Sequence, residues 1–128
     1  MSNNNRIIKF RVWNKYQKFF LEPDSFAVMG NGSLLFFDYH NGQDLSWNRD
    51  CWNIQGELYA VQQFTGLLDK NSKEIFEGDI VKLYVGNGKY HNYTIRFKDG
   101  CFMVGGDILV HHNRECEVIG NISKTPNY

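Results

Sequence analysis

The sequence predicts a mostly β protein in which an antiparallel N-terminal lobe packs with a small SH3-like C-terminal β-barrel. Short apolar stretches recur at intervals of roughly eight to twelve residues, a spacing typical of sandwiches and small barrels. Aromatic residues, which favour strands and fill cores, make up 16% of the 128 residues. The chain has 12 glycines and 2 prolines, so Gly, Asn and Asp are expected to make most of its turns.

The first half contains a period-two segment and a clear hairpin signal. Residues 8–13 alternate apolar side chains with basic or aromatic ones, which predicts a strand, and residues 16–21 can return as its partner. Gly30-Asn31-Gly32 separates two apolar runs and predicts a hairpin, because Gly and Asn tolerate positive φ. Residues 44–57 are ambiguous, and their spacing allows a short helix that opens near Ser46.

The second half is predicted to be a series of strands joined by tight turns. Gly86-Asn87-Gly88 and Lys98-Asp99-Gly100 are expected hairpin turns. A Gly-Asp-Ile-Val strand opening at residues 78–81, followed by a strand that ends in Phe-Lys-Asp-Gly, leads us to expect an SH3-like barrel. We therefore assign residues 1–63 to the N-terminal β lobe with a variable insert and residues 64–128 to the barrel, as two lobes or one compact domain. The expected strands of this half are residues 58–64, 80–85, 90–97, 101–104, 108–110 and 117–122.

Charge and hydropathy argue against several classes of partner. The formal net charge is zero, so no global field attracts nucleic acid or membrane. Apolar runs such as Leu34–Phe37 are far too short to span a bilayer, and the polar residues 1–5 do not resemble a signal peptide. The three cysteines are widely spaced and form no Cys-x-x-Cys pair. We expect a cytoplasmic protein with reduced thiols and no membrane association.

The residues His111, His112 and Cys116 are close enough in sequence to be considered as metal ligands. Zinc needs three or four converging ligands, and adjacent histidines on a strand point to opposite faces. We interpret these residues as an ordinary loop at a strand end. Cys101 or Cys116 with either histidine would be the minimum pair for a thiolate mechanism, but no local signature surrounds the cysteines. We predict neither a metal site nor catalysis here.

Four carboxylates, Asp69, Glu74, Glu77 and Asp79, cluster along a short segment and suggest an acid–base pair. Carboxylates at turns more often accept hydrogen bonds from their own backbone than transfer protons. The chain contains no Walker motif and no Gly-x-Gly-x-x-Gly, so no nucleotide cofactor is predicted. We expect a protein without cofactors that is not an enzyme.

The first predicted strand combines basic and aromatic side chains. Lys9, Arg11 and Trp13 share one face of it, and Lys15 and Tyr16 follow at its end. Single-stranded nucleic acid can stack on such platforms, so these five residues are the candidate nucleic-acid or partner contacts. The alternative, which we favour, is that Trp13 covers its neighbours or lies in a subunit interface.

The segment from Phe64 to Val81 resembles the YopX family of phage and prophage proteins. Phe10-Arg-Val-Trp13 is similar to the family's Phe-Arg-x-Trp opening, and residues 97–102 resemble its Phe-x-Asp-Gly-x-Phe. Residues 117–122 resemble its closing strand. Ser72 stands where the family usually has Gly, so we expect this turn to depart from type I′, which needs positive φ at both central residues.

The resemblance implies a phage-encoded, mostly β protein in a bacterial cytoplasm. It transfers no catalytic residues, because the family's function is unassigned. Our leading hypothesis is a non-enzymatic phage or prophage accessory protein that acts by binding and assembles into a homo-oligomer. The alternative is a module that binds single-stranded DNA or RNA, and a small hydrolase is the third hypothesis.

Overall fold

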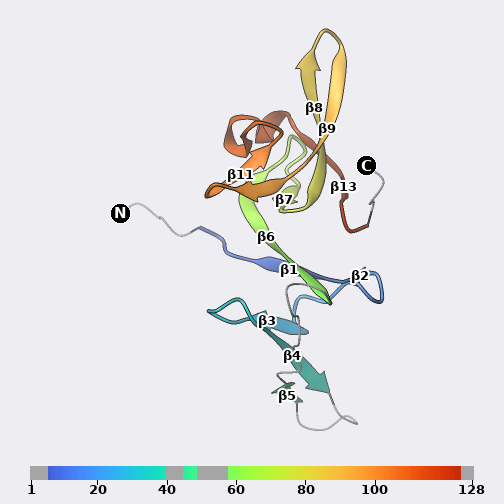
Figure 1. The fold of residues 1–128 in the computed structure, drawn as a ribbon, viewed down its shortest axis with the longest axis vertical. Helices are drawn as coiled ribbons and strands as arrows, with labels where there is room; N and C mark the ends of the chain where they lie inside the picture. Colours follow the sequence, from blue (N-terminus) through green and yellow to red (C-terminus); the bar gives the residue numbers. More distant parts are fainter. Residues whose placement is uncertain (1–5, 40–44, 49–57, 125–128) are drawn as a thin grey trace. The chain divides into compact units, whose positions relative to one another are not determined.

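The computed structural model describes residues 6–39, 45–48 and 58–124 (Figure 1). These residues form β-strands and two short 3-10 helices, and every strand pair with a described register is antiparallel. The prediction of a mostly β protein is therefore confirmed. The chain divides into an N-terminal unit, Phe10–Val61, and a C-terminal unit, which combines Met1–Lys9 with Gln62–Tyr128.

The N-terminal unit contains short antiparallel strands. Its elements are β1 (Phe10–Asn14), β2 (Phe19–Phe20), β3 (Phe26–Val28), β4 (Leu34–Tyr39), β5 (Leu45–Asn48) and the start of β6 (Tyr59–Leu68). β1 pairs with β2, which confirms the predicted return strand. β3, β4 and β5 form a three-stranded sheet in that order. The predicted hairpin between β3 and β4 is also confirmed, since Gly32 adopts φ +89° and its N–H donates to the Met29 carbonyl at 2.8 Å.

The strand β5 corrects one prediction. Leu45–Asn48 pairs with β4, with Trp47 opposite Phe37, so the helix expected to open near Ser46 does not begin there. Backbone N–H and C=O groups of these four residues form hydrogen bonds with β4, whereas in a helix they would have bonded to each other. Residues 49–57 lie outside the described residues.

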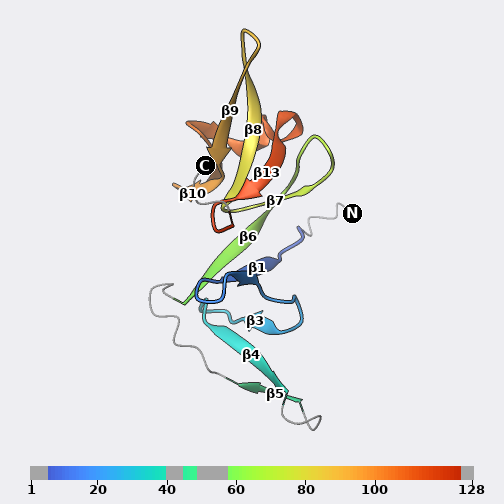
Figure 2. The same cartoon turned by 90° about the vertical axis from the view of Figure 1, so that its right-hand side faces the viewer.

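The C-terminal unit contains the rest of β6 and most of the strands (Figure 2). These are β7 (Glu74–Phe76), β8 (Asp79–Gly86), β9 (Lys89–Thr94), β10 (Arg96–Lys98), β11 (Cys101–Val104), β12 (Asp107–Ile108) and β13 (Glu117–Asn121), with 3-10 helices η2 (Leu109–His111) and η3 (Asn113–Glu115). One sheet has the order β13-β8-β9 and another has the order β10-β11-β12. Their shared core consists of Ile75, Val81, Leu83, Ile95, Val104, Leu109 and Cys116.

The strand predicted over residues 108–110 is shorter than expected. β12 ends at Ile108, and η2 begins at Leu109, whose side chain is fully buried. The N–H of His112 donates to the Leu109 carbonyl at 2.8 Å, which closes the turn. The chain therefore turns inward at Leu109 to bury it, whereas a straight strand would have continued along the sheet.

Both hairpin turns predicted for this half are confirmed. Asn87 and Gly88 have φ of 55° and 72° and connect the paired residues Gly86 and Lys89. The second turn, over residues 99–100, has φ of 53° and 82° and connects β10 to β11. Positive φ at both central residues is the geometry of a type I′ turn, which matches the right-handed twist of the flanking strands.

The turn between β6 and β7 departs from type I′, as predicted. Ser72 has φ 64°, whereas Asn71 is not among the residues with positive φ. The Ser72 N–H donates to the Asp69 carbonyl at 3.0 Å, and the Asp69 N–H donates to the Lys73 carbonyl at 2.8 Å. A serine with left-handed φ costs about 1 kcal/mol relative to a glycine at the same position.

The strand β6 runs without interruption across residues 63 and 64, the predicted boundary between the two lobes. That boundary stays a prediction. No helix in the described ranges is long and apolar enough to cross a membrane.

Candidate functional site

The predicted basic strand has a buried rather than an exposed tryptophan. Only 5% of Trp13 is accessible, and its ring packs edge-on against Phe20 with a centroid distance of 4.8 Å. The guanidinium of Arg11 lies 4.7 Å from the centroid of the same Phe20 ring. Trp13 thus contributes to packing, the alternative we favoured, and it offers no free ring face for a base. Lys15 and Tyr16 are exposed, Tyr16 by 85%.

Lys9 belongs to the C-terminal unit, whereas the other four candidates belong to the N-terminal unit. Its ammonium group pairs with the carboxylate of Glu74 and lies 5.2 Å from the centroid of the Phe64 ring. The five candidate residues are therefore divided between the two units. Their contact with nucleic acid or a partner stays a prediction.

The three residues considered as metal ligands are separated by the fold. Cys116 is fully buried in the core, and burial raises the pKa of its thiol to about 11. His111 and His112 instead contact the carboxylate of Asp107, at 3.2 and 2.7 Å. Within the described part of the chain, no three His, Cys, Asp or Glu side chains are grouped to hold a metal. Chiefly through the bond to His112, the pKa of Asp107 falls to about 2.

Three of the four clustered carboxylates, those of Asp69, Glu77 and Asp79, accept hydrogen bonds from backbone N–H groups. Asp69 accepts hydrogen bonds from the N–H groups of Asn71, Lys73 and Val118, at 2.8, 2.9 and 2.8 Å. Asp79 accepts one from the Phe76 N–H at 2.8 Å. The prediction that turn carboxylates bond to the backbone is confirmed for Asp69 and Asp79.

Asp79 also belongs to a buried polar cluster with Gln62 and Asn121. The side-chain amide of Asn121 donates to Gln62 Oε1 at 3.0 Å and to Asp79 Oδ1 at 3.2 Å, and all three residues are buried. Glu77 Oε1 accepts from the Gln63 N–H at 3.2 Å. Buried polar groups of this kind stabilise one arrangement of the chain when their bonds are satisfied.

The hairpin of β8 and β9 is an exposed candidate for recognition in the C-terminal unit. We call residues 82–92 the arm, which projects from the rest of this unit (Figures 1 and 2). Lys82 is opposite Asn92 and Tyr84 is opposite Tyr90, so these four side chains share one face. All four are exposed, with 48% of Tyr84 and 56% of Tyr90 accessible.

Local contacts order the side chains of the arm. The rings of Tyr84 and Tyr90 meet edge-on with centroids 5.2 Å apart, and the Lys82 ammonium lies 4.7 Å from the Tyr90 centroid. The Gly88 N–H donates to the Tyr84 hydroxyl at 3.0 Å. Ordered aromatic side chains lose little conformational freedom when a partner binds, which favours recognition.

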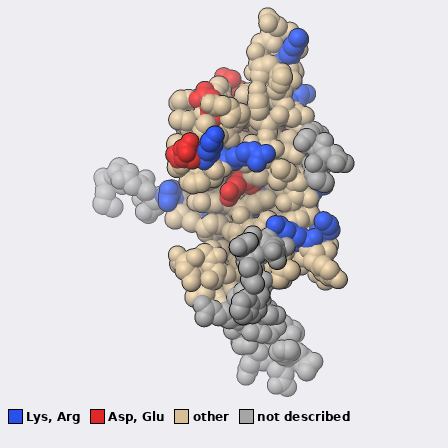
Figure 3. All heavy atoms as spheres, in the orientation of Figure 1, with Lys and Arg blue, Asp and Glu red and all other residues tan. Residues whose placement is uncertain are grey.

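The arm is positively charged. It contains Lys82 and Lys89, and the longer run of residues 80–98 adds Arg96 and Lys98 and has no Asp or Glu. In the view of Figure 3, lysine or arginine atoms and no acidic atoms are visible on the hairpin. Glu117 on β13 is opposite Lys82, and Glu117 Oε1 lies 3.7 Å from the Lys70 ammonium nitrogen. The acid-free run is a sequence signal for this surface, although the denser basic residues of the first strand led the prediction there instead.

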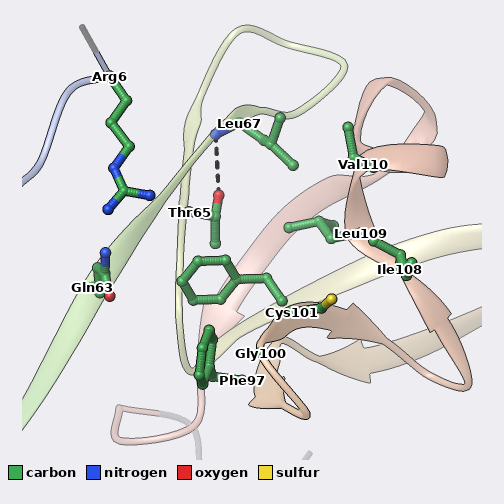
Figure 4. Close-up of a pocket in the computed structure, with 11 residues that line it drawn as sticks. Arg6, Gln63, Thr65, Leu67, Phe97, Gly100, Cys101, Ile108, Leu109 and Val110 are labelled. Atoms are coloured by element: carbon green, nitrogen blue, oxygen red, sulfur yellow. Dashed lines mark hydrogen bonds between the residues drawn. The ribbon is translucent and has the colours of Figure 1, made fainter. Parts of the chain in front are cut away.

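A cavity of about 530 Å³ lies elsewhere in the C-terminal unit (Figure 4). Residues of β6, β10, β11, β12 and η2 line it, together with Arg6. Most of its lining is apolar, and Cys101 contributes a partly exposed thiol. The exposed arm and this cavity are therefore both candidate places for a partner in the C-terminal unit.

The comparison with protein families shows where the chain belongs. The family model described as YopX protein matches residues 9–128. The chain belongs to the YopX family. The match covers nearly all of the chain, including the stretch between the short motifs of its first half, so the resemblance identified from the sequence is confirmed.

Solved structures are similar to this YopX-family chain over almost its whole length. Protein EF1440 from Enterococcus faecalis is 28% identical, with a TM-score of 0.66, and the alignment covers 96% of this chain and 98% of that one. Protein yopX from Bacillus subtilis is 19% identical, with a TM-score of 0.59, and the alignment covers 92% and 94%. At 19% identity, the similarity to yopX shows a shared fold and nothing more. Among curated proteins, no sequence matches the chain.

Proposed function

We propose that this YopX-family chain is a phage or prophage accessory protein that acts by binding and is not an enzyme. The observation that carries the proposal is the arm, which presents ordered tyrosines and lysines to solvent. Asp69 and Asp79, the two buried acids of the segment from Phe64 to Val81, meanwhile accept hydrogen bonds from backbone N–H groups. In this proposal the protein works in the cytoplasm of a bacterial host, where its cysteines stay reduced.

We further propose that residues 64–128 form an SH3-like small barrel and that the arm is its extension. The support is the succession of short strands from β7 to β13, joined by tight turns around one apolar cluster. Small barrels of this kind bind partners through their loops and hairpins, while the core keeps the scaffold rigid.

Assembly into a homo-oligomer is the first role proposed for the arm. β9 is at the edge of the described order β13-β8-β9, and an edge strand can pair with a strand of another chain. Val85 and both tyrosines are exposed, by 45% to 56%, and tyrosine is enriched at subunit interfaces. Burial of these side chains in an assembly would remove apolar surface from water.

Light scattering coupled to size-exclusion chromatography tests the assembly. We expect a mass that is a multiple of 15.0 kDa, and we expect Tyr84→Ser with Tyr90→Ser to shift it toward the monomer. Tyr16→Ser is the matched control, because Tyr16 is more exposed than either arm tyrosine and lies in the N-terminal unit. A monomeric mass for the unmodified chain at every concentration would remove this role.

Binding of single-stranded nucleic acid is the second candidate, and the charge of the arm favours it. Lys82 and Lys89 on the arm, with Arg96 and Lys98 on β10 in the same acid-free run, provide the electrostatic attraction. Tyr84 and Tyr90 provide exposed rings, and stacking of a base on such a ring contributes about 1–3 kcal/mol. A single strand could therefore follow the exposed face of the hairpin.

Fluorescence anisotropy of a labelled oligothymidylate tests this candidate over a range of salt concentrations. Lys82→Gln with Lys89→Gln should weaken binding and reduce the salt slope by about 1.4, because each lost phosphate contact contributes about 0.7. Tyr84→Ala with Tyr90→Ala should weaken binding and leave the slope nearly unchanged. Lys15→Gln is the control for the predicted first strand. Loss of binding in that control alone, or no binding at low salt, would exclude the arm as the nucleic-acid-binding surface.

A further inference from the structure

The cavity of the C-terminal unit has the volume of a small-molecule site. Its volume of about 530 Å³ lies within the range of pockets that hold drug-sized ligands. All of its lining residues belong to the C-terminal unit. Cavities of this kind, built by several strands and a loop, bind ligands with an apolar body and a few fixed polar contacts.

The wall of the cavity is apolar and incompletely covered by the chain. Phe97 and Val110 line it and are 54% and 56% exposed, although large apolar side chains are usually buried. The rings of Phe97 and Phe102 meet edge-on with centroids 5.1 Å apart. Leu67 and Leu109 complete the wall. An apolar ligand would remove this surface from water.

The polar end of the cavity is positively charged. Figure 4 shows the guanidinium of Arg6 pointing toward the side-chain amide of Gln63. Among the described residues that line the cavity, Arg6 alone is charged, and none is Asp or Glu. Within the same described ranges Arg6 has no ion pair, whereas the Thr65 hydroxyl already donates to the Ile75 carbonyl and accepts from the Leu67 N–H. Arg6 and Gln63 thus remain as donors for a ligand.

We propose that this cavity binds a small apolar carboxylate. A guanidinium binds a carboxylate through two parallel hydrogen bonds, and the apolar body would lie against Phe97, Phe102 and Val110. This chemistry is shared by a fatty acid and by the C-terminus of an apolar peptide. The inference is independent of the function proposed for the arm, because the arm contributes no residue to the cavity lining.

The test uses ligands that differ only in their head group. We titrate the full chain with decanoate and with decan-1-ol, and we follow the backbone amide signals of Gly100, Cys101 and Phe102 by NMR. Decanoate should bind about tenfold more tightly than the alcohol, the effect of one charge-assisted contact. A parallel titration compares N-acetyl-leucyl-leucyl-valine with its C-terminal amide. Tighter binding of decanoate or of the free-acid peptide identifies the source of the carboxylate.

Variants connect the binding to the cavity. Arg6→Gln should lower the affinity for the carboxylate by about tenfold and leave that for the neutral analogue unchanged. Lys98→Gln is the control, since Lys98 is a cation on β10 that does not line the cavity. Val110→Glu places a negative charge on an exposed part of the wall and should weaken binding of both carboxylates.

Alkylation of Cys101 gives an independent readout. Iodoacetamide should modify this thiol, and bound ligand should slow the modification, measured on the Cys101 peptide by mass spectrometry. The proposal is overturned if neither carboxylate binds, or if each binds no better than its neutral analogue. It is equally overturned if Arg6→Gln leaves carboxylate affinity unchanged in a chain whose amide spectrum shows it to be folded.

Discussion

The Oδ2 atom of Asp69 accepts a hydrogen bond of 2.8 Å from the backbone N–H of Val118, so a turn residue holds the last strand in place. The other carboxylate oxygen accepts from Asn71 and Lys73 within the turn itself. One buried side chain therefore connects the turn after β6 to β13, across 49 positions of the sequence. The acid has a structural role that depends on having two acceptor oxygens.

Replacement of Asp69 by Asn should destabilise the protein by about 2 kcal/mol. The amide oxygen can still cap the turn, but the amide nitrogen would face the Val118 N–H, and two donors would meet in a buried site. Urea unfolding measures the free-energy difference. Asp99→Asn is the control, because Asp99 is exposed in a type I′ turn where Asn is equally suitable. Equal effects of both variants would contradict the role assigned to Asp69.

Gly78→Ala should destabilise the protein more than Gly66→Ala. The two glycines have nearly the same φ, +85° and +84°, so a Cβ costs each about 1–2 kcal/mol of backbone strain. A Cβ at Gly78 would also lie 2.7 Å from Gln62 Nε2, whereas one at Gly66 meets nothing within 4 Å. Because Gln62 is buried and bonded to Asn121, it cannot move freely, and we expect about 1 kcal/mol more. Thermal unfolding compares the two variants, and an equal loss would mean that Gln62 gives way.

The turns were predictable because positive φ is a local property of a few residues. Asn87-Gly88 and Asp99-Gly100 have the residue types that a type I′ turn needs, and the structure contains both turns. The family was predictable as well, since the segment from Phe64 to Val81 resembles it and the family model matches residues 9–128. The bond between Asp69 and Val118 was not predictable, because nothing near Asp69 indicates which distant N–H will reach it.

The exposure of the arm could not be deduced from period-two alternation. Val85 is 45% exposed, although Val81 and Leu83, which alternation places on the same face of β8, are buried in the core. How far a hairpin extends beyond the core depends on tertiary packing, which the pattern of β8 does not report. The cavity beside β11 depends on three-dimensional placement in the same way, because Arg6 and Phe97 are far apart in the sequence. The sequence predicted the hairpin turn at Gly86-Asn87-Gly88, and the acid-free run from residue 80 to residue 98 is the further signal that it contains for this surface.

Ser72→Gly should stabilise the protein by roughly 0.5–1 kcal/mol. Ser72 adopts φ 64°, which glycine reaches without the clash of a Cβ, although glycine loses more backbone entropy on folding. The family's usual Gly at this position is therefore expected to be the more stable choice. Asn87→Gly is the control, because Asn tolerates positive φ and should gain little. Chemical denaturation measures the stability of both variants, and a loss of stability in Ser72→Gly would contradict the backbone strain inferred at Ser72.

His112→Ala should raise the pKa of Asp107 from about 2 toward its ordinary value of 3.8. The bond to His112 is the largest cause of the lowered pKa, and the Ile108 N–H and His111 remain to keep part of the shift. A lowered pKa means that the carboxylate favours the folded chain above about pH 4, and this contribution disappears as the pH falls through 2. Carbon-13 NMR of the Asp107 carboxyl group follows the titration. An unchanged midpoint in the variant would assign the shift to the backbone.

The free energy of unfolding should decrease as the pH rises from about 9 toward 11, with Cys116 as a main cause. Burial raises the thiol pKa from 9.0 to about 11, so the unfolded chain loses this proton at a lower pH than the folded chain. The thiol therefore contributes its full stabilisation below pH 9 and loses it as the pH rises through 11, by at most about 3 kcal/mol in all. Urea unfolding at a series of pH values measures the slope.

Cys116→Ala isolates this contribution. The variant leaves a small cavity and costs about 1 kcal/mol at neutral pH, but its stability should decrease less steeply above pH 9. Cys101→Ala is the matched control, since Cys101 is only partly buried and its removal should leave the alkaline slope intact. Identical slopes for the unmodified chain and Cys116→Ala would show that the core opens before the thiol ionises. In an open core the thiol has the same pKa as in the unfolded chain, so its ionisation no longer affects the free energy of unfolding.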